Sequence, residues 1–400
     1  MSLAVRVLML SWEYPPLVVG GLGRHVEAVA RELVAAGHHV QVVVRGEKSE
    51  TVDELVDGVH VRRAAADPIA VDFTTESLLA WSQAAEHALV RAALPLVAGR
   101  RSRFDVVHAH DWLVAQSAQT IAQVTGAPLV TTVHATEAGR HHGWLPQPLN
   151  LAIHSVEGWL VQSSAAVIAC STAMRDEVTS LFEVPQSRVT VVPNGIDVQQ
   201  WQIRPRDRAS AQAARSGAPL IAFVGRLVHE KGVQTLLDAL PVLRRSYPDA
   251  RLVIAGTGVH EANLHARARR LRIARSVDWL GFVSDDEVAG VLAAADVIVV
   301  PSLYEPFGIV ALEAAAARTP LVAADTGGLR DLIAAGVATA TFRPGDVDGL
   351  TAAVRDVLAD PQQSRRSTAR AIRVVRQNYT WSAVAAQTAE VYSRAAGSAQ

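Results

Sequence analysis

The chain alternates between short apolar runs and longer stretches in which apolar residues recur every three or four positions. Residues 5–11 (VRVLMLS) are almost wholly apolar, and residues 24–37 have the spacing of an amphipathic helix that ends at Gly37. Short Val- and Ile-rich runs of this kind predict parallel strands that are buried on both faces and separated by helices. Similar runs follow at residues 38–45, 105–111, 128–135, 165–171 and 189–195.

The same alternation starts again after a break in composition. Residues 203–219 are polar, rich in Arg and Ala, and end on Gly and Pro, which predicts a linker or an irregular helix beside one. We therefore expect an α/β chain of two doubly wound, Rossmann-like domains, residues 1–200 and 201–379, with a terminal helix at 380–400 that packs back on the first domain. The apolar runs of the second domain are residues 220–226, 250–258, 277–284, 297–302 and 320–328.

Composition limits the classes of protein that remain. Of the 400 residues, 50% are hydrophobic and 19% are charged, so the chain can bury real cores and is not disordered. The net charge of −1 gives no reason to expect nucleic-acid binding, and we interpret basic runs such as residues 267–275 (RARRLRIAR) as solvated helix faces or turns. The single cysteine, Cys170, excludes an internal disulfide, and its apolar context predicts a small buried residue.

No targeting or membrane-spanning segment is evident in the sequence. Residues 3–10 are too short for a signal peptide, and residues 112–136 are interrupted by Gly126 and Pro128. These features predict a cytoplasmic protein whose contact with membranes is at most peripheral.

Ligands of doubly wound sheets bind beyond the carboxyl ends of the strands, so polar residues that follow strands are the candidates for chemistry. After the first strand, Gly20–His25 (GGLGRH) open a helix, where glycines let backbone N–H groups approach an anion. The spacing differs from the G-x-G-x-x-G of dinucleotide-binding proteins, so it supports a dinucleotide site only weakly. A tight turn without a ligand is the alternative.

Histidines follow two strands in the middle of the first domain. In HAHDW, His108 and His110 share a strand face. A metal pair, a structural His–Asp cluster and a substrate-facing role for His110 or Asp111 all stay open, although no third metal ligand is evident at a convincing spacing. His134 ends the next strand, where it can bond a sugar hydroxyl or serve as a core histidine.

The second domain carries its charges at two strand–helix junctions. Arg226 and Lys231 flank one turn and can converge on a phosphate group, although exposed charges often flank helix starts. The stretch SLYEPFGIVALEAAAA places Glu305 at the second junction and Glu313 in the helix that follows. Residues eight apart lie about 12 Å apart along a helix axis. The two acids therefore suit the two ends of an elongated ligand better than an acid/base pair.

Together these segments resemble the retaining glycosyltransferases of GT-B architecture, in the family 4, glycogen synthase-like group. The resemblance covers essentially the whole chain and rests on GGLG, HAHDW, TVHATEAGRH, PNGID, GRLVHEKG and EPFGIVALEA with its Glu-x7-Glu spacing. SWEYPPLVVGGLGRHV and HATEAGRHHGWL are most similar to the actinobacterial α-(1→4)-glucosyltransferases of methylglucose polysaccharide and glycogen synthesis.

The resemblance implies two domains that face each other across a cleft, and transfer of glucose from UDP- or ADP-glucose to an α-(1→4)-glucan or glucosylglycerate-type acceptor. It implies no cofactor and no metal. Arg226 and Lys231 are then expected to hold the donor diphosphate, Glu305 the transferred sugar and Glu313 the ribose, with His134 beside the reacting sugar. The other donor-binding positions are Gly21, Gly23, Val283, Phe307, Gly308, Ile309 and Val310, and the acceptor side consists of Asp111, Trp112 and Glu137.

One position departs from the pattern of this group. Bacterial glycogen synthases carry a lysine two residues before the paired glycines, where this chain has Val18. The departure bears on identity as an ADP-glucose glycogen synthase and not on glycosyl transfer. The alternatives are a glycosyltransferase with another sugar or acceptor, such as a maltose-1-phosphate synthase or a mannosyltransferase, a nucleotide-sugar epimerase, a silent nucleotide-sugar binder, and a nicotinamide oxidoreductase.

Overall fold

The computed structural model of the chain consists of two compact units. The first unit comprises Met1–Gly195 and Trp381–Gln400, and the second comprises Ile196–Thr380. Most of the predicted linker at residues 203–219 and all of Val18 lie outside the residues that the structure describes. The described residues are 4–17, 20–74, 76–99, 104–204, 208–209 and 217–397.

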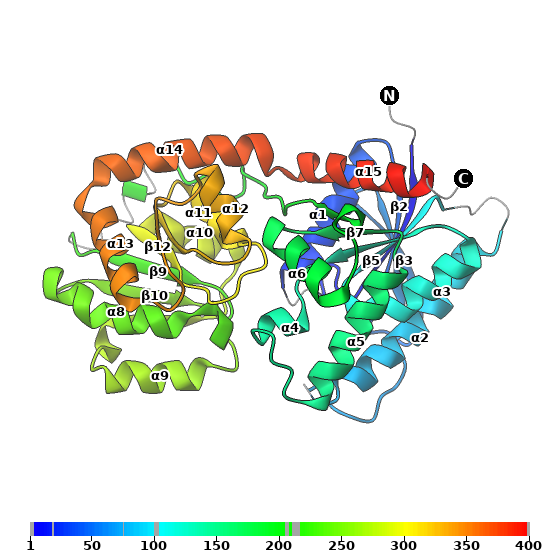
Figure 1. Ribbon diagram of the computed structural model, residues 1–400, viewed down its shortest axis with the longest axis horizontal. Helices are drawn as coiled ribbons and strands as arrows, with labels where there is room; N and C mark the ends of the chain where they lie inside the picture. The colour runs from blue at the N-terminus through cyan, green and yellow to red at the C-terminus, as the bar shows by residue number, and fades with distance from the viewer. Residues whose placement is uncertain are drawn as a thin grey trace. The chain divides into compact units, whose positions relative to one another are not determined.

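The first unit is built on an eight-stranded sheet in the order β3-β4-β2-β1-β5-β6-β7-β8 (Figure 1). All neighbouring strands are parallel except β3 and β4, which form an antiparallel hairpin at one edge. The strands are β1 (Arg6–Ser11), β2 (His39–Arg45), β3 (Val52–Val56), β4 (Val59–Ala64), β5 (Val106–His110), β6 (Leu129–Val133), β7 (Ala166–Ala169) and β8 (Val189–Val191).

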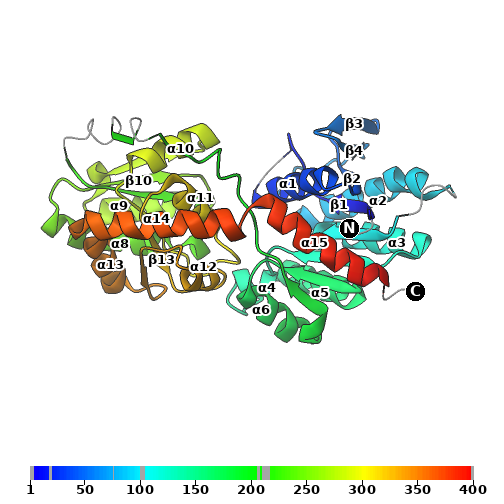
Figure 2. The ribbon, with the colours of Figure 1, turned by 90° about the horizontal axis from the view of Figure 1, so that it is seen from above.

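Helices cover both faces of this sheet, and each face has its own hydrophobic core. Alternate residues of β1 point to opposite faces: Val7 and Met9 pack with α1 (Gly21–Ala35) and α15 (Trp381–Gly397). Leu8 and Leu10 pack on the other face with α2 (Leu78–Val97), α3 (Ala115–Thr125) and part of α5 (Pro148–Ser163). Figure 2 shows α15 lying along α1. The short α4 (Glu137–Arg140) and α6 (Thr172–Phe182) follow β6 and β7.

The second unit has a six-stranded sheet, parallel throughout, in the order β11-β10-β9-β12-β13-β14. Its strands are β9 (Leu220–Val224), β10 (Arg251–Ala255), β11 (Val277–Gly281), β12 (Val297–Val300), β13 (Leu321–Ala324) and β14 (Ala340–Phe342). A core that includes Leu236, Leu264 and Val354 joins one face of this sheet to α8 (Val233–Ser246), α9 (Glu261–Arg270) and α13 (Val347–Ala359). The remaining helices are α10 (Asp285–Ala294), α11 (Ile309–Ala317), α12 (Leu329–Ala335) and α14 (Pro361–Asn378).

These two sheets confirm the predicted α/β class with doubly wound, Rossmann-like architecture. The β3–β4 hairpin and β14 were not predicted. Cys170 is buried, as its apolar context indicates. Within the described part of the chain, no helix has both the length and the apolar character needed to cross a membrane.

Candidate active-site residues

The carboxyl ends of β9, β12 and β13 bring the charged residues of the second unit together. The loop after β9 carries Arg226 and Lys231, and the loop after β12 carries Glu305. Backbone hydrogen bonds join these loops: Leu303 N donates to Glu230 O (2.8 Å), and Gly328 N donates to Glu305 O (2.8 Å). The polar side chains therefore project from loops whose backbones are fixed to one another.

Gly232 allows the β9 loop to lie directly against the end of β12. Its φ is +71°, and a Cβ atom at this position would lie 1.8 Å from the carbonyl oxygen of Pro301. No other residue fits both the left-handed backbone and this close approach. The glycine thus places Lys231, its neighbour, opposite the residues that follow β12.

Lys231 and Glu305 form an ion pair at this edge of the sheet. Lys231 Nζ lies 2.9 and 2.8 Å from the two carboxylate oxygens of Glu305, and Ser302 Oγ donates to Glu305 Oε2 at 2.9 Å. The two side chains are only 20% and 10% exposed. The structure thus joins two predicted site residues directly and adds Ser302, which the sequence did not single out.

The other predicted donor residues of the second unit lie in loops after strands or at and within α11. Arg226 is exposed, Val283 is half-buried in the loop after β11, and Glu313 is buried in α11. The helix begins at Ile309, two residues later than expected, so Gly308 is its N-cap, with φ +109°. Ile309 and Val310 form the first turn of α11, and the side chain of Phe307 is buried. Next to Val283, the aromatic ring of Phe282 is 84% exposed, a feature that the apolar pattern did not indicate.

The first unit gathers histidines from three separate segments. His25 comes from the second turn of α1, His110 ends β5, and His134 follows β6. His110 Nδ1 lies 3.3 Å from His134 Nε2, and the rings of His25 and His134 meet edge to face with centroids 4.8 Å apart. His25 is held by Asn194, whose Oδ1 lies 2.8 Å from His25 Nδ1.

Burial keeps these histidines uncharged at neutral pH. It lowers the pKa of His25 to about 3 and that of His134 to about 4, and it holds the pKa of His110 well below its usual value. A neutral His134 can accept or donate a hydrogen bond. It carries no positive charge at neutral pH.

The histidine cluster also bears on the metal pair of His108 and His110 that the sequence left open. His108 is engaged elsewhere, with Tyr392 Oη (2.7 Å) and Thr132 Oγ1 (2.8 Å). The third ligand that the sequence did not show is His25, since ligand atoms of His25, His110 and His134 lie within 4.8 Å of one another. Neutral imidazoles are the form that binds transition metals, so this trio is the group among the described residues that has the donors to hold an ion.

Asp111 fixes the loop that carries His134. Its Oδ1 accepts a hydrogen bond from His134 N at 2.7 Å, and its own φ is +62°. Burial raises the pKa of Asp111 to about 6, while the bond from His134 N and the charge of Arg140 act in the opposite direction. Trp112, which follows Asp111, is buried.

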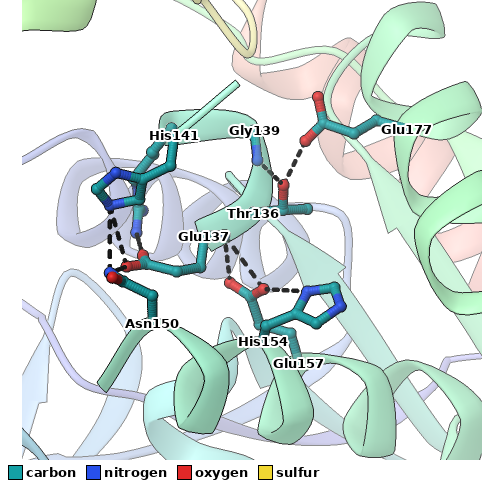
Figure 3. Close-up of polar contacts among 9 residues, drawn as sticks. Thr136, Glu137, Gly139, His141, Asn150, His154, Glu157 and Glu177 are labelled. Carbon is teal, nitrogen blue, oxygen red and sulfur yellow. Dashed lines mark hydrogen bonds and ion pairs between the residues drawn. The ribbon is translucent and has the colours of Figure 1, made fainter. Parts of the chain in front are cut away.

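Glu137 begins α4, shortly after His134 in the chain, and belongs to a polar network (Figure 3). The Glu137 carboxylate accepts from Asn150 Nδ2 (2.6 Å) and pairs with Arg140 (3.4 Å), and its N–H donates to both carboxylate oxygens of Glu157 (2.9 and 3.1 Å). Burial raises the pKa of Glu157 to about 8. Thr136 Oγ1 caps α4 by accepting from Gly139 N (2.9 Å). The network fixes the short helix that directly follows the His134 loop.

Gly21 and Gly23 lie in the first turn of α1, which begins at Gly21. Gly20 N donates to Glu13 Oε2 at 3.1 Å. The two predicted glycines are thus at a helix N-terminus beyond the carboxyl end of β1, the position at which backbone N–H groups can meet an anion.

These two doubly wound units, with charged loops after β9 and β12, match known protein families. Residues 19–200 match the family described as Glycosyltransferase Family 4, and residues 205–374 match Glycosyl transferases group 1. The chain belongs to these glycosyltransferases, has the GT-B fold, and is a hexosyltransferase.

Individual relatives and solved structures show which glycosyltransferases the chain is similar to. The chain is 45% identical over 397 residues to a glycogen synthase of Mycobacterium tuberculosis, covering 97% of this chain and 94% of that protein. It is 30% identical to the alpha-maltose-1-phosphate synthase of Mycolicibacterium smegmatis, covering 98% and 99%. The fold is similar to sucrose-phosphate synthase from Thermosynechococcus elongatus (TM-score 0.81, 21% identity, 98% and 100% covered) and to the catalytic domain of starch synthase IV from Arabidopsis thaliana (TM-score 0.76, 19% identity, 98% and 100% covered).

Proposed function

We propose that the enzyme transfers glucose, with retention of anomeric configuration, from UDP- or ADP-glucose to an α-(1→4)-glucan or a glucosylglycerate-type acceptor. The observation that carries the proposal is the Lys231–Glu305 pair on loops fixed at the carboxyl edge of the second sheet. The 45% identity to a glycogen synthase supports glucose as the transferred sugar and a glucan as the acceptor. The neighbouring fold of starch synthase IV was solved with ADP and acarbose, which supports a nucleotide-sugar donor.

In the proposed reaction the bond from the sugar C1 to the donor phosphate oxygen breaks, and the diphosphate leaves with the electron pair. Arg226 and Lys231 stabilise the charge that grows on the diphosphate, together with N–H groups at Gly21 and Gly308–Val310. The acceptor hydroxyl attacks C1 from the same face, and its proton passes to the leaving phosphate oxygen. Glu305 positions the hydroxyls of the transferred sugar, and Glu313 holds the ribose.

His134 acts beside the sugar as a neutral group. Its pKa of about 4 keeps it uncharged at pH 7, so it offers a hydrogen bond without opposing an oxocarbenium-like sugar. Asp111 and Glu137 help to position the loop that carries His134. Asp111 accepts a hydrogen bond from the His134 N–H, and Glu137 begins the short helix that follows. In this proposal Asp111, Glu137 and Trp112 form the acceptor side.

The proposed reaction uses no cofactor and no metal ion, because the guanidinium of Arg226 and the ammonium of Lys231 supply the positive charge at the diphosphate. Turnover in EDTA should equal turnover without it. We also propose that the enzyme acts in the cytoplasm without nucleic acid, with contact to membranes at most peripheral.

The donor and acceptor are tested in two stages. Thermal-shift measurements with UDP-glucose, ADP-glucose and GDP-mannose identify the nucleotide sugar that stabilises the protein. Mass analysis then follows transfer to a short α-glucan, glucosylglycerate, glucose 1-phosphate or a phosphoinositide, with a reaction lacking acceptor as control. We expect hexose addition to the α-glucan or glucosylglycerate from a glucose donor. Stabilisation by GDP-mannose alone, transfer to glucose 1-phosphate alone, or a changed nucleotide sugar without acceptor would each overturn the proposal.

A further inference from the structure

A cavity of about 760 Å³ lies at the amino edge of the sheet in the second unit, and its wall is rich in arginine. Three of these arginines belong to the basic run at residues 267–275, which the sequence led us to interpret as a solvated helix face or turn. The run does turn from the end of α9 into the approach to β11, and its arginines Arg269, Arg272 and Arg275 are exposed and border the hollow. The arginines that line the cavity are Arg244, Arg251, Arg269, Arg272 and Arg275.

The fold places this cavity away from the candidate active-site residues. Ala218 precedes β9, Arg251 begins β10, and Ser276 precedes β11, so the cavity lies where three neighbouring parallel strands start. Arg226 and Lys231 follow the other end of β9. A ligand in the cavity would leave the proposed donor site open.

Two of the five guanidinium groups are held by other groups of the protein. Arg251 Nε donates to Asp278 Oδ2 at 2.9 Å, and its second bond to this carboxylate completes a bidentate pair. Arg244 is fixed by neutral partners, the carbonyl oxygen of Pro248 (2.9 Å from Nε) and the hydroxyl of Ser276. Arg244 thus keeps its full charge while its position is set.

The other three side chains, those of Arg269, Arg272 and Arg275, make no ion pair or hydrogen bond with any described residue. Arg272 has φ +59°, a left-handed backbone that is uncommon for residues other than glycine. This backbone conformation lies at the point where the chain leaves α9 and turns past the cavity.

The net charge around the cavity is positive even after the nearby carboxylates and helix ends are counted against the five arginines. Asp278 offsets Arg251, and Asp249 is the only carboxylate among the described residues of the wall. The carboxyl ends of α8 and α9 also point to this edge, and each contributes roughly half a negative charge. These terms together leave about two positive charges without a partner, which matches the charge of one phosphate monoester.

We propose that this cavity binds a small phosphate-bearing molecule, either a sugar phosphate or free phosphate. Guanidinium groups match phosphate oxygens in a two-pronged geometry, and several arginines around one hollow can hold one or two phosphate groups. The volume falls within the roughly 300–1,000 Å³ that small-molecule sites occupy. This site is independent of the proposed glucosyl transfer.

Calorimetric titration of the full-length protein tests the site, with fructose 1,6-bisphosphate as the probe and fructose as the neutral control. We expect saturable binding of one bisphosphate per chain and none of fructose. The double variant Arg269→Ala with Arg275→Ala should bind at least tenfold more weakly. Arg270→Ala is the matched control, since Arg270 is on the same helix and does not line the cavity; it should bind within about twofold of the unmodified protein.

Two further variants keep the test decisive. Arg272→Lys keeps the positive charge but loses the two-pronged guanidinium, so it should weaken binding several-fold. This variant still tests the site if the double variant folds poorly. Lys231→Ala should bind the probe normally. A parallel titration with inorganic phosphate separates the two sources: equal affinity identifies free phosphate as the ligand, and much weaker affinity identifies a sugar phosphate.

Three results would overturn the proposal. The first is no saturable binding of either probe. The second is equal binding by the double variant. The third is loss of binding in Lys231→Ala, which would place the probe at the donor residues instead. Tight binding of RNA that is lost in the double variant, with no binding of the small phosphates, would also contradict a small-molecule site.

Discussion

Replacing Lys231 by alanine separates the two roles that the structure gives this residue. The ammonium group neutralises Glu305, whose carboxylate is otherwise bonded to Ser302, and in the proposed reaction it stabilises the leaving diphosphate. Lys231→Ala therefore leaves a carboxylate that is 10% exposed without its cation and removes a preorganised charge from the donor site.

The two consequences have different sizes. Removing one partner of a buried ion pair costs about 3–5 kcal/mol of stability, whereas an exposed pair is worth at most about 1 kcal/mol. Side chains that are 20% and 10% exposed lie between these limits, and we expect a loss of about 2 kcal/mol. Loss of one preorganised donor lowers turnover by about 10²–10³-fold.

Urea unfolding and initial-rate measurements on the same preparation distinguish these effects. The double variant Lys231→Met with Glu305→Gln removes both charges, so its stability should return to within about 1 kcal/mol of the unmodified protein. Its turnover should remain low. Lys48→Ala is the matched control, because Lys48 is the other lysine of the chain and is exposed in the first unit.

One outcome would refute this reasoning outright. If folded Lys231→Ala turned over at a rate near that of the unmodified enzyme, Lys231 would have no role at the diphosphate. If the double variant regained turnover along with stability, the pair would serve the fold alone.

Three further predictions concern other parts of the site. Asp111→Ala should lower kcat about tenfold, because His134 N loses its acceptor, whereas Asp111→Asn should keep most activity since its amide oxygen can still accept; equal losses in steady-state assays would contradict a positioning role. Glu313→Gln should raise the donor KM about tenfold with little change in kcat, and an unchanged KM would remove Glu313 from the ribose site. The pKa of Glu157 is about 8 in the fold and 4.5 when unperturbed. The contribution of the protonated Glu157 to the stability of the fold is therefore full below pH 4.5 and is lost as the pH rises through 8. Melting temperatures from pH 5 to 8.5 should therefore fall less steeply in Glu157→Gln, and parallel curves would exclude a proton on Glu157.

The strands of both sheets were predictable because most are buried on both faces and appear as short Val- and Ile-rich runs. The β3–β4 hairpin escaped this criterion, since β3 alternates between half-buried and exposed residues at the edge of the sheet. A signal was nevertheless present. Asp57 and Gly58 join the two strands with positive φ values, and Asp-Gly between alternating residues is a strong hairpin indicator.

The site was predictable in its residue types and less so in its contacts. Arg226, Lys231 and Glu305 were identified because they follow strands, and Glu313 because it lies eight residues beyond Glu305 in the helix that follows. The direct pairing of Lys231 with Glu305 depends on the close approach of two loops far apart in the chain, which no local pattern encodes. His25 was missed for a similar reason, because an amphipathic helix pattern does not show which residue of α1 meets His110 and His134.

The stereochemistry of the product tests the central claim most directly. Proton NMR can follow the new glycosidic bond while the enzyme acts on a nucleotide-α-glucose donor and a short α-(1→4)-glucan. The account predicts that the first bond formed has the α configuration, with release of the nucleoside diphosphate in equal amount. A β-linked first product, or release of glucose without transfer to the glucan, would contradict it.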